Sequence, residues 1–206
     1  MKGYEYKNMS TCYFVSLYTR DWVDIFERPV YKQLIVHSLN HFSDQKGLVI
    51  YAWCLMSNHL FLLMRPDGMV PLQELVTAFR AFTEEKILAA ADTEPEPRRK
   101  WILNHFRAPS GFMGLQREWQ LWEEQWQPIH IDMANVEDLL HQFEFIHQQP
   151  VRELIVDAAP DYRYSSARDY EGSKGLVQIR KIPDIENELA ASSSYTSRFV
   201  ARYLRR

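Results

Sequence analysis

The sequence predicts an α+β fold with an antiparallel sheet and helices on one face of that sheet. The first observation is a run of β-forming residues over 11–19. The second is a pair of apolar runs, 48–56 and 59–64, which are separated by Ser57-Asn58 and so indicate two strands joined by a tight turn. The third is the order strand, helix, strand, strand, helix, followed by a further strand and helix. This order is typical of the split β-α-β unit of ferredoxin-like (RRM-like) folds.

The first helix is expected between the strand at 11–19 and the hairpin. Residues 20–27 form a connection, and Pro29 then stands where it suits the first turn of a helix. Apolar residues recur after it at helical spacing, at Val30, Leu34, Ile35, Leu39 and Phe42. Gly47 is expected to end this helix, because glycine is the preferred residue just beyond a helix.

The hairpin that follows is nearly continuous in apolar residues. We therefore expect both of its strands in the middle of a sheet that helices cover. A polar residue, His59, opens the second strand. His59 is the first candidate for a chemical site, although one histidine alone makes a poor metal site.

A second helix is expected to begin at Pro71 and to keep its apolar face as far as Leu88. Residues 92–97 form a charged linker. The next stretch leaves alternatives open, because residues 101–106 fit either a short strand or a short helix. Residues 119–131 fit an irregular aromatic loop that leads into a short strand.

The third helix is expected to have Asn135 as its N-cap and to run to about residue 148, where Pro150 stops it. On this helix His147 lies on a different face from Phe145, so we expect its side chain at the surface. We assign residues 1–170, with a core at 11–170, to one domain. Residues 171–206 form a C-terminal extension that is partly helical, with a basic helix over 195–206.

The bulk composition is that of an ordinary soluble globular protein, with 46% apolar and 25% charged residues. No apolar run approaches the roughly 18 residues of a membrane span, so we expect a cytoplasmic protein without a membrane partner. Cys12 and Cys54 are expected to be buried free thiols, and no Cys/His spacing fits a zinc site. The net charge of −3 argues mildly against strong nonspecific DNA binding, although Arg98-Arg99-Lys100 forms a local basic patch.

Five segments of the chain have patterns that occur together, in this order, in one known family. They are CLMSNHLFLL at 54–63, FRAFTEEKIL at 79–88, LWEEQWQP at 121–128, FEFIHQQPV at 143–151 and YRYSSARDY at 162–170. Over about residues 11–180 the chain resembles the REP-associated tyrosine transposases. These enzymes of DNA transposition and recombination are relatives of the small single-domain insertion-sequence transposases and have the HUH-endonuclease type of fold.

The resemblance implies a site for cutting single-stranded or hairpin DNA. In the family, a His-hydrophobic-His strand binds Mg²⁺ or Mn²⁺, and a helix tyrosine attacks the phosphate to form a 5′-phosphotyrosine. The first metal-binding position matches His59 and the second matches Phe61. The nucleophile position matches Phe145, and the residue four places later, which can help to bind the metal, matches Gln149.

These matches imply a catalytically impaired or inactive protein, a pseudoenzyme. Residues at i and i+2 of a strand point the same way, but Phe61 cannot bind a cation and Phe145 has no hydroxyl. His59 with the amide oxygen of Gln149 would make a poor Mg²⁺ or Mn²⁺ site, so we expect the metal to be absent or weakly held. One alternative is an active enzyme with another nucleophile, for which the candidates are Tyr162, Tyr164 and Tyr170. Another is a protein-interaction module, which the acidic net charge favours.

Single-stranded or hairpin DNA is the partner that the resemblance implies. Arg98, Arg99 and Lys100 are the candidate contacts to its backbone, and Trp122 and Trp126 are candidates for stacking on its bases. Core or loop packing is the competing interpretation of these tryptophans. The insertion-sequence relatives are dimers and the REP-associated branch is monomeric, so we favour a monomer and keep a dimer as the alternative.

Overall fold

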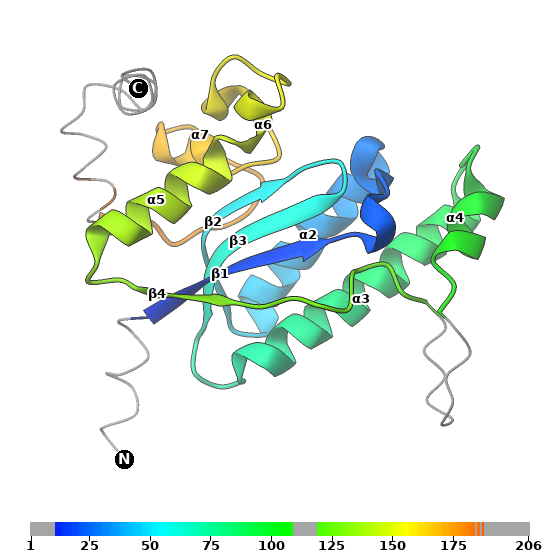
Figure 1. Cartoon of the computed structure of the whole chain (residues 1–206), viewed down its shortest axis with the longest axis horizontal. Helices are drawn as coiled ribbons and strands as arrows, with labels where there is room; N and C mark the ends of the chain where they lie inside the picture. Colours follow the sequence, from blue (N-terminus) through cyan, green and yellow to red (C-terminus); the bar gives the residue numbers. More distant parts are fainter. Residues whose placement is uncertain (1–10, 109–118, 184, 186, 188–206) are drawn as a thin grey trace.

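Four strands form one antiparallel sheet in the order β2-β3-β1-β4 (Figure 1). Their bounds are Thr11–Tyr18 for β1, Leu48–Leu55 for β2, His59–Pro66 for β3 and Ile129–Asp132 for β4. The computed structural model describes residues 11–108, 119–183, 185 and 187. With one long helix between β1 and β2, and a long and a short helix between β3 and β4, this is the ferredoxin-like arrangement. The predicted α+β fold class is therefore confirmed.

The main helices begin and end where the sequence provides the signals. Pro29 lies in the first turn of the first long helix, and Gly47 follows its end with a φ of +75° that an L side chain rarely adopts. Asn135 is the predicted N-cap, because its Oδ1 accepts a 3.3 Å bond from the backbone N–H of Asp138.

The helices are α2 (Pro29–Gln45), α3 (Leu72–Thr93), α4 (Arg99–His105), α5 (Val136–His147), α6 (Gln149–Arg152) and α7 (Ala167–Tyr170). The short 3-10 turns are η1 (Arg20–Trp22), η2 (Ile25–Glu27) and η3 (Ala159–Asp161). None of the described helices is long and apolar enough to span a membrane.

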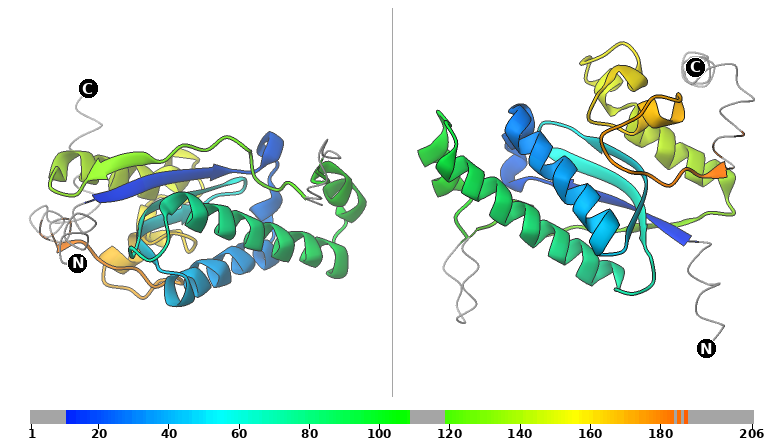
Figure 2. Two further views of the ribbon diagram at one scale, coloured as in Figure 1. Left: turned by 90° about the horizontal axis from the view of Figure 1, so that it is seen from below. Right: turned by 180° about the vertical axis from the view of Figure 1, so that it is seen from behind.

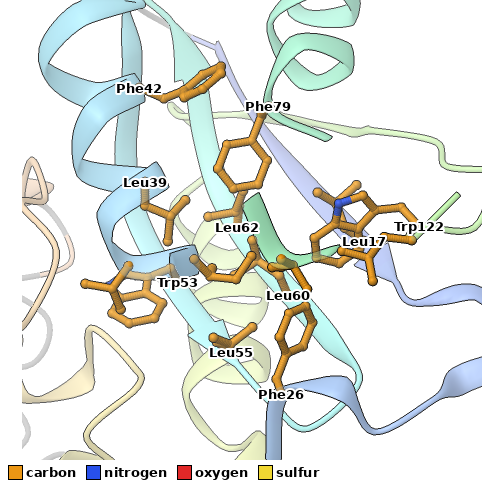
Figure 3. Close-up of a cluster of buried hydrophobic side chains, with 14 of the residues drawn as sticks. Leu17, Phe26, Leu39, Phe42, Trp53, Leu55, Leu60, Leu62, Phe79 and Trp122 are labelled. Carbon is orange, nitrogen blue, oxygen red and sulfur yellow. The ribbon is translucent and has the colours of Figure 1, made fainter. Parts of the chain in front are cut away.

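The first core lies between the sheet and the pair α2 and α3, which run side by side on one face (Figure 2). Figure 3 shows Trp53 and Leu62 of the sheet beside Leu39 of α2 and Phe79 of α3. Because side chains alternate along a strand, the residues next to Trp53 and Leu62 in the chain point to the opposite face of the sheet.

The second core lies on the opposite face, against α5. Phe61 and Leu63 of β3 pack there with Phe143 and Ile146 of α5. The expectation of helices on one face only is thus correct for α2 and α3 and wrong for α5. The physical reason was present in the hairpin, because strands that are apolar on both faces need cover on both.

The edge of β2 is covered by a later segment of the chain. The nearly continuous apolar run of β2 predicts a strand in the middle of the sheet, whereas β2 is the edge strand of the four. Its backbone is still paired, because the N–H of Leu55 donates to the carbonyl of Tyr164 at 2.9 Å. The N–H of Ser166 likewise donates to the carbonyl of Trp53 at 3.0 Å. This pairing explains why an edge strand has the sequence of a central one.

Residues beyond 170 continue along the same body. Val177 is buried in the first core and Ile182 in the second, and the N–H of Arg180 donates to the carbonyl of Ile50 on β2 at 2.8 Å. The proposed domain boundary at residue 170 stays a prediction. The basic helix expected over 195–206 lies outside the described residues.

Candidate functional site

His59 lies at the start of β3, on the face of the sheet that carries α5. Its Nδ1 is 2.8 Å from Oδ1 of Asn58. The amide of Asn58 is oriented by its Nδ2, which donates to the carbonyl of Trp22 at 3.1 Å. Since Oδ1 can only accept, Nδ1 of His59 is assigned the proton and Nε2 the lone pair. Nε2 has no hydrogen-bond partner among the residues that the structure describes.

Burial keeps the His59 imidazole neutral. Desolvation lowers its pKa to about 4, and the Asp24 carboxylate opposes this with a smaller effect that raises it. At neutral pH the ring is therefore a neutral base, and its unprotonated Nε2 is a buried atom. A metal or a hydrogen-bond donor could use that nitrogen if the surroundings supplied the other ligands.

The surroundings of His59 are aromatic carbon. The ring of Phe61 lies 4.5 Å from the imidazole and 5.5 Å from the ring of Phe145 on α5. Phe14 of β1 completes the group, 5.5 Å from Phe61 and 5.8 Å from Phe145. Phe61 is only 3% exposed, so the cluster excludes water from the position beside the imidazole. The structure thus brings together His59, Phe61 and Phe145, the three residues that the family resemblance matches to site positions.

Gln149 is close to this group, but its side-chain amide is engaged in a hydrogen bond to the backbone. α5 ends at His147, and Gln149 opens the separate helix α6. Its Nε2 donates to the backbone carbonyl of Phe145 at 3.0 Å. The amide therefore satisfies the end of α5.

These residues do not fit a divalent cation. Hard cations need several oxygen or nitrogen ligands, whereas His59 has phenyl rings as neighbours. The guanidinium of Arg152 lies 5.2 Å from the ring of Phe145 and adds a positive charge nearby. No cluster of three or more His, Cys, Asp or Glu that could hold a metal occurs in the described ranges.

Two of the alternative tyrosines have structural partners on β2. The hydroxyl of Tyr162 donates to the carbonyl of Leu55 at 2.8 Å, and burial raises the pKa of Tyr162. The hydroxyl of Tyr170 donates to the carbonyl of Tyr51 at 3.0 Å. The ring of Tyr164 lies 4.7 Å from Nζ of Lys32. These contacts account for all three as packing residues of the segment that covers the sheet edge.

The predicted DNA-contacting residues divide into surface and core. Arg98 lies 3.7 Å from both Glu27 and Glu96, and Arg99 lies 3.1 Å from Asp92. Lys100 is exposed on α4, and no ion pair involves it within the described part of the chain. α4 itself settles the open choice for residues 101–106 in favour of a helix.

The two predicted tryptophans differ in burial. Trp122 is fully buried, and its Nε1 donates to Oγ1 of Thr83 at 2.9 Å, so its assignment to base stacking is wrong. Trp126 is half-buried against the first core. Trp122 follows the competing interpretation, which was packing, and the role of Trp126 stays a prediction.

His147 is a correction to the sequence analysis. It is fully buried rather than at the surface, and its Nε2 lies 2.7 Å from Oγ of Ser166. Burial lowers the pKa of His147 to about 3. Ser166 also accepts from the N–H of Trp53 at 2.9 Å, so this pair ties α5 to the cover of the β2 edge.

Sequence reasoning missed a second group of aromatic residues beside His59. Trp22 in η1 is 58% exposed, and its ring lies 4.4 Å from that of Tyr18 at the end of β1. Tyr18 pairs with His59 in the sheet, and their rings are 5.5 Å apart. The available signal was a tryptophan in a polar connection, outside any apolar period.

Comparison with known proteins supports the fold. No family model and no curated protein matches the sequence. Among solved structures, a REP-associated tyrosine transposase bound to a REP hairpin matches with a TM-score of 0.55 and 13% identity, over 84% of this chain and 87% of that one. A putative transposase from Deinococcus radiodurans R1 gives a TM-score of 0.42 and 16% identity, over 66% of this chain and 90% of that one. At 13% identity the first likeness shows the fold alone: the chain has the fold of the REP-associated tyrosine transposase.

Proposed function

We propose that this protein binds single-stranded or hairpin DNA and does not cut it by attack of a helix tyrosine. The observation that carries the proposal is the contact between Phe61 and Phe145, whose rings pack 5.5 Å apart beside His59. In the family that the sequence resembles, these two positions hold a metal ligand and the nucleophile. A phenyl ring has neither a lone pair for a cation nor a hydroxyl that can attack phosphorus.

Support for DNA binding comes from the fold and from local charge. The solved transposase with this fold holds a REP hairpin. In this chain α4 and the residue before it carry Arg98, Arg99 and Lys100, and Lys100 is exposed. Phosphate contacts of this kind give affinity that falls as salt rises.

Fluorescence anisotropy of the whole chain with labelled, folded DNA hairpins tests the binding. We expect measurable affinity at low salt, about 50 mM, and a linear fall of log K with log salt. A blunt duplex of the same composition is the control for general attraction to DNA. Absence of binding to every hairpin and single strand at low salt would contradict the proposal.

Trapping a covalent complex tests the second half. Incubation with Mn²⁺ and a single-stranded substrate, followed by denaturing electrophoresis, is expected to show no protein–DNA adduct. An adduct would support the alternative of an active enzyme, and mass spectrometry would show whether Tyr162, Tyr164 or Tyr170 carries the DNA.

A protein-interaction module is the second candidate function. The net charge of −3 favours it over general nucleic-acid binding. It predicts no affinity for hairpins at low salt, so the anisotropy experiment separates the two candidates.

A further inference from the structure

The exposed ring of Trp22 lies in an unusual place for a large apolar side chain. It is 58% exposed, yet one side of it packs on Tyr18 with 4.4 Å between ring centroids and 37° between planes. Tyr18 in turn lies 5.5 Å from the imidazole of His59. One face of the Trp22 ring is therefore packed on Tyr18, and much of the side chain remains open to solvent.

The backbone holds Trp22 in this position. Asp21 and Trp22 have φ values of 54° and 57°, in the left-handed region that residues other than glycine rarely adopt. Three contacts over-determine the conformation: the carbonyl of Trp22 accepts from Asn58, the N–H of Asp21 donates to Glu123 at 2.8 Å, and the carboxylate of Asp21 lies 3.3 Å from Nε2 of His105. The ring is thus presented on a fixed support.

The contact with His105 joins this support to α4. The ring of His105 stacks on Trp101 with 4.9 Å between centroids and 14° between planes. Trp101 is 49% exposed and immediately follows Lys100. Two supported, half-open indole rings therefore lie on neighbouring elements, with the basic residues at the α4 end and His59 at the other.

We infer that Trp22 and Trp101 are stacking positions for unpaired bases of single-stranded DNA that runs from α4 toward His59. The inference rests on the proposed function and names the part of the DNA that these residues contact. Every base has a π face, so supported aromatic rings bind bases without reading their sequence. Lys100 and Arg99 lie beside Trp101, where a phosphate backbone would pass.

Charge around the two rings is mostly compensated. Asp21 and Glu27 each lie 3.7 Å from an arginine, Arg20 and Arg98 respectively. Asp24 is the exposed carboxylate that acts on His59. Its negative charge would repel a phosphate near His59. Removing that charge should therefore tighten DNA binding, whereas removing either indole ring should weaken it.

The experiment compares two hairpins, one blunt and one with an unpaired tail of several nucleotides, in anisotropy titrations of the full chain. We expect wild type to bind the tailed hairpin more tightly. Trp22→Ala and Trp101→Ala are each expected to weaken tailed binding by roughly 5- to 150-fold, the range for loss of one base–aromatic stack, and to leave blunt binding unchanged. Trp22→Phe is expected to retain most of the affinity. Asp24→Asn is expected to tighten tailed binding.

The controls separate failure of base stacking from failure of DNA binding. Met69→Ala, at an 86% exposed residue between β3 and α3, is the matched control for removing a surface apolar side chain. Thermal unfolding of each variant shows that folding is preserved. If wild type binds both hairpins equally, or if Trp22→Ala and Trp101→Ala leave tailed binding unchanged, the stacking inference is overturned while the proposed function stands. If wild type binds no DNA, the proposed function fails and the inference fails with it. Weaker binding by Asp24→Asn would contradict the predicted course of the strand.

Discussion

The imidazole of His59 and the ring of Phe61 point to the same side of β3, with 4.5 Å between their centroids. This is the geometry that an alternating strand gives to residues at i and i+2. It would suit a pair of metal-binding histidines, but only one of the two positions carries a ligand atom. The scaffold for metal binding and the chemistry of metal binding are therefore separate properties in this chain.

This separation predicts a gain of function. Phe61→His combined with Phe145→Tyr would place a second imidazole beside His59 and a hydroxyl on α5. We expect this double variant to bind Mn²⁺ measurably by calorimetry, whereas wild type does not. Phe145→Tyr alone is the control, because it adds the hydroxyl without the second ligand. Equal Mn²⁺ affinity in wild type and the double variant would show that His59 and Phe61 do not define the site.

The Phe cluster also predicts a stability effect. Phe61 contacts Phe14, Tyr18 and Phe145 and is almost wholly buried. Phe61→Ala is expected to lower the free energy of unfolding by about 3–5 kcal/mol, the usual range for removing a buried phenyl ring. Urea titration followed by circular dichroism measures it, with Met69→Ala as the matched surface control. A loss below about 1 kcal/mol would mean that the cluster is loosely packed.

Glu96 predicts that the free energy of unfolding falls in acid solution. Burial alone would raise its pKa, but bonds from Arg28, the backbone N–H of Arg98 and the hydroxyl of Tyr31 outweigh it and lower the pKa to about 2. The carboxylate therefore stabilises the fold above its ordinary pKa of 4.5, and this is lost as pH falls toward 2. Glu96→Gln should flatten the profile between these values. Urea midpoints from pH 5 to pH 2 provide the measurement, and an unchanged slope would contradict the assignment.

His147 predicts a further loss of stability that begins at a higher pH than the loss due to Glu96. Its pKa falls from 6.5 to about 3 because burial disfavours the imidazolium, so the unfolded chain binds the proton first. Stability is complete above pH 6.5 and declines as pH falls toward 3. His147→Gln keeps a hydrogen-bonding group near Ser166 without a titrating ring, and it should reduce the decline between pH 6.5 and 5. His59, whose pKa falls to about 4, contributes in the same direction, so His59→Gln with His147→Gln should remove more of the slope than either change alone.

Local signals in the sequence were sufficient for β1, for the hairpin of β2 and β3, and for the helices α2, α3 and α5. The turn at Ser57-Asn58 is closed by a 2.9 Å bond from the N–H of Met56 to the carbonyl of His59, as the two apolar runs predicted. The cap at Asn135 and the start at Pro29 are equally local. The juxtaposition of Phe61 with Phe145 was also foreseen, through the resemblance to a known family.

Tertiary placement could not be predicted in the same way. β2 can be an apolar edge strand because a segment more than a hundred residues later covers it. No local pattern in the sequence encodes that pairing. His147 appeared to be a surface residue because its own helix pattern gives no sign of Ser166 above it. Trp22 is exposed because two left-handed residues hold it there, and backbone conformation of this kind has no apolar period to detect.

The cover over β2 has a consequence for how the molecule behaves among its own copies. An uncovered apolar strand of eight residues would present free backbone groups to which a second chain could add a strand. The opposite edge, β4, has four residues that are mostly exposed and end in an aspartate, so it is a poor template. The segment around Tyr164 and Ser166 therefore protects the protein against edge-to-edge polymerisation, and a chain that ends before it would tend to form fibrils or swapped assemblies.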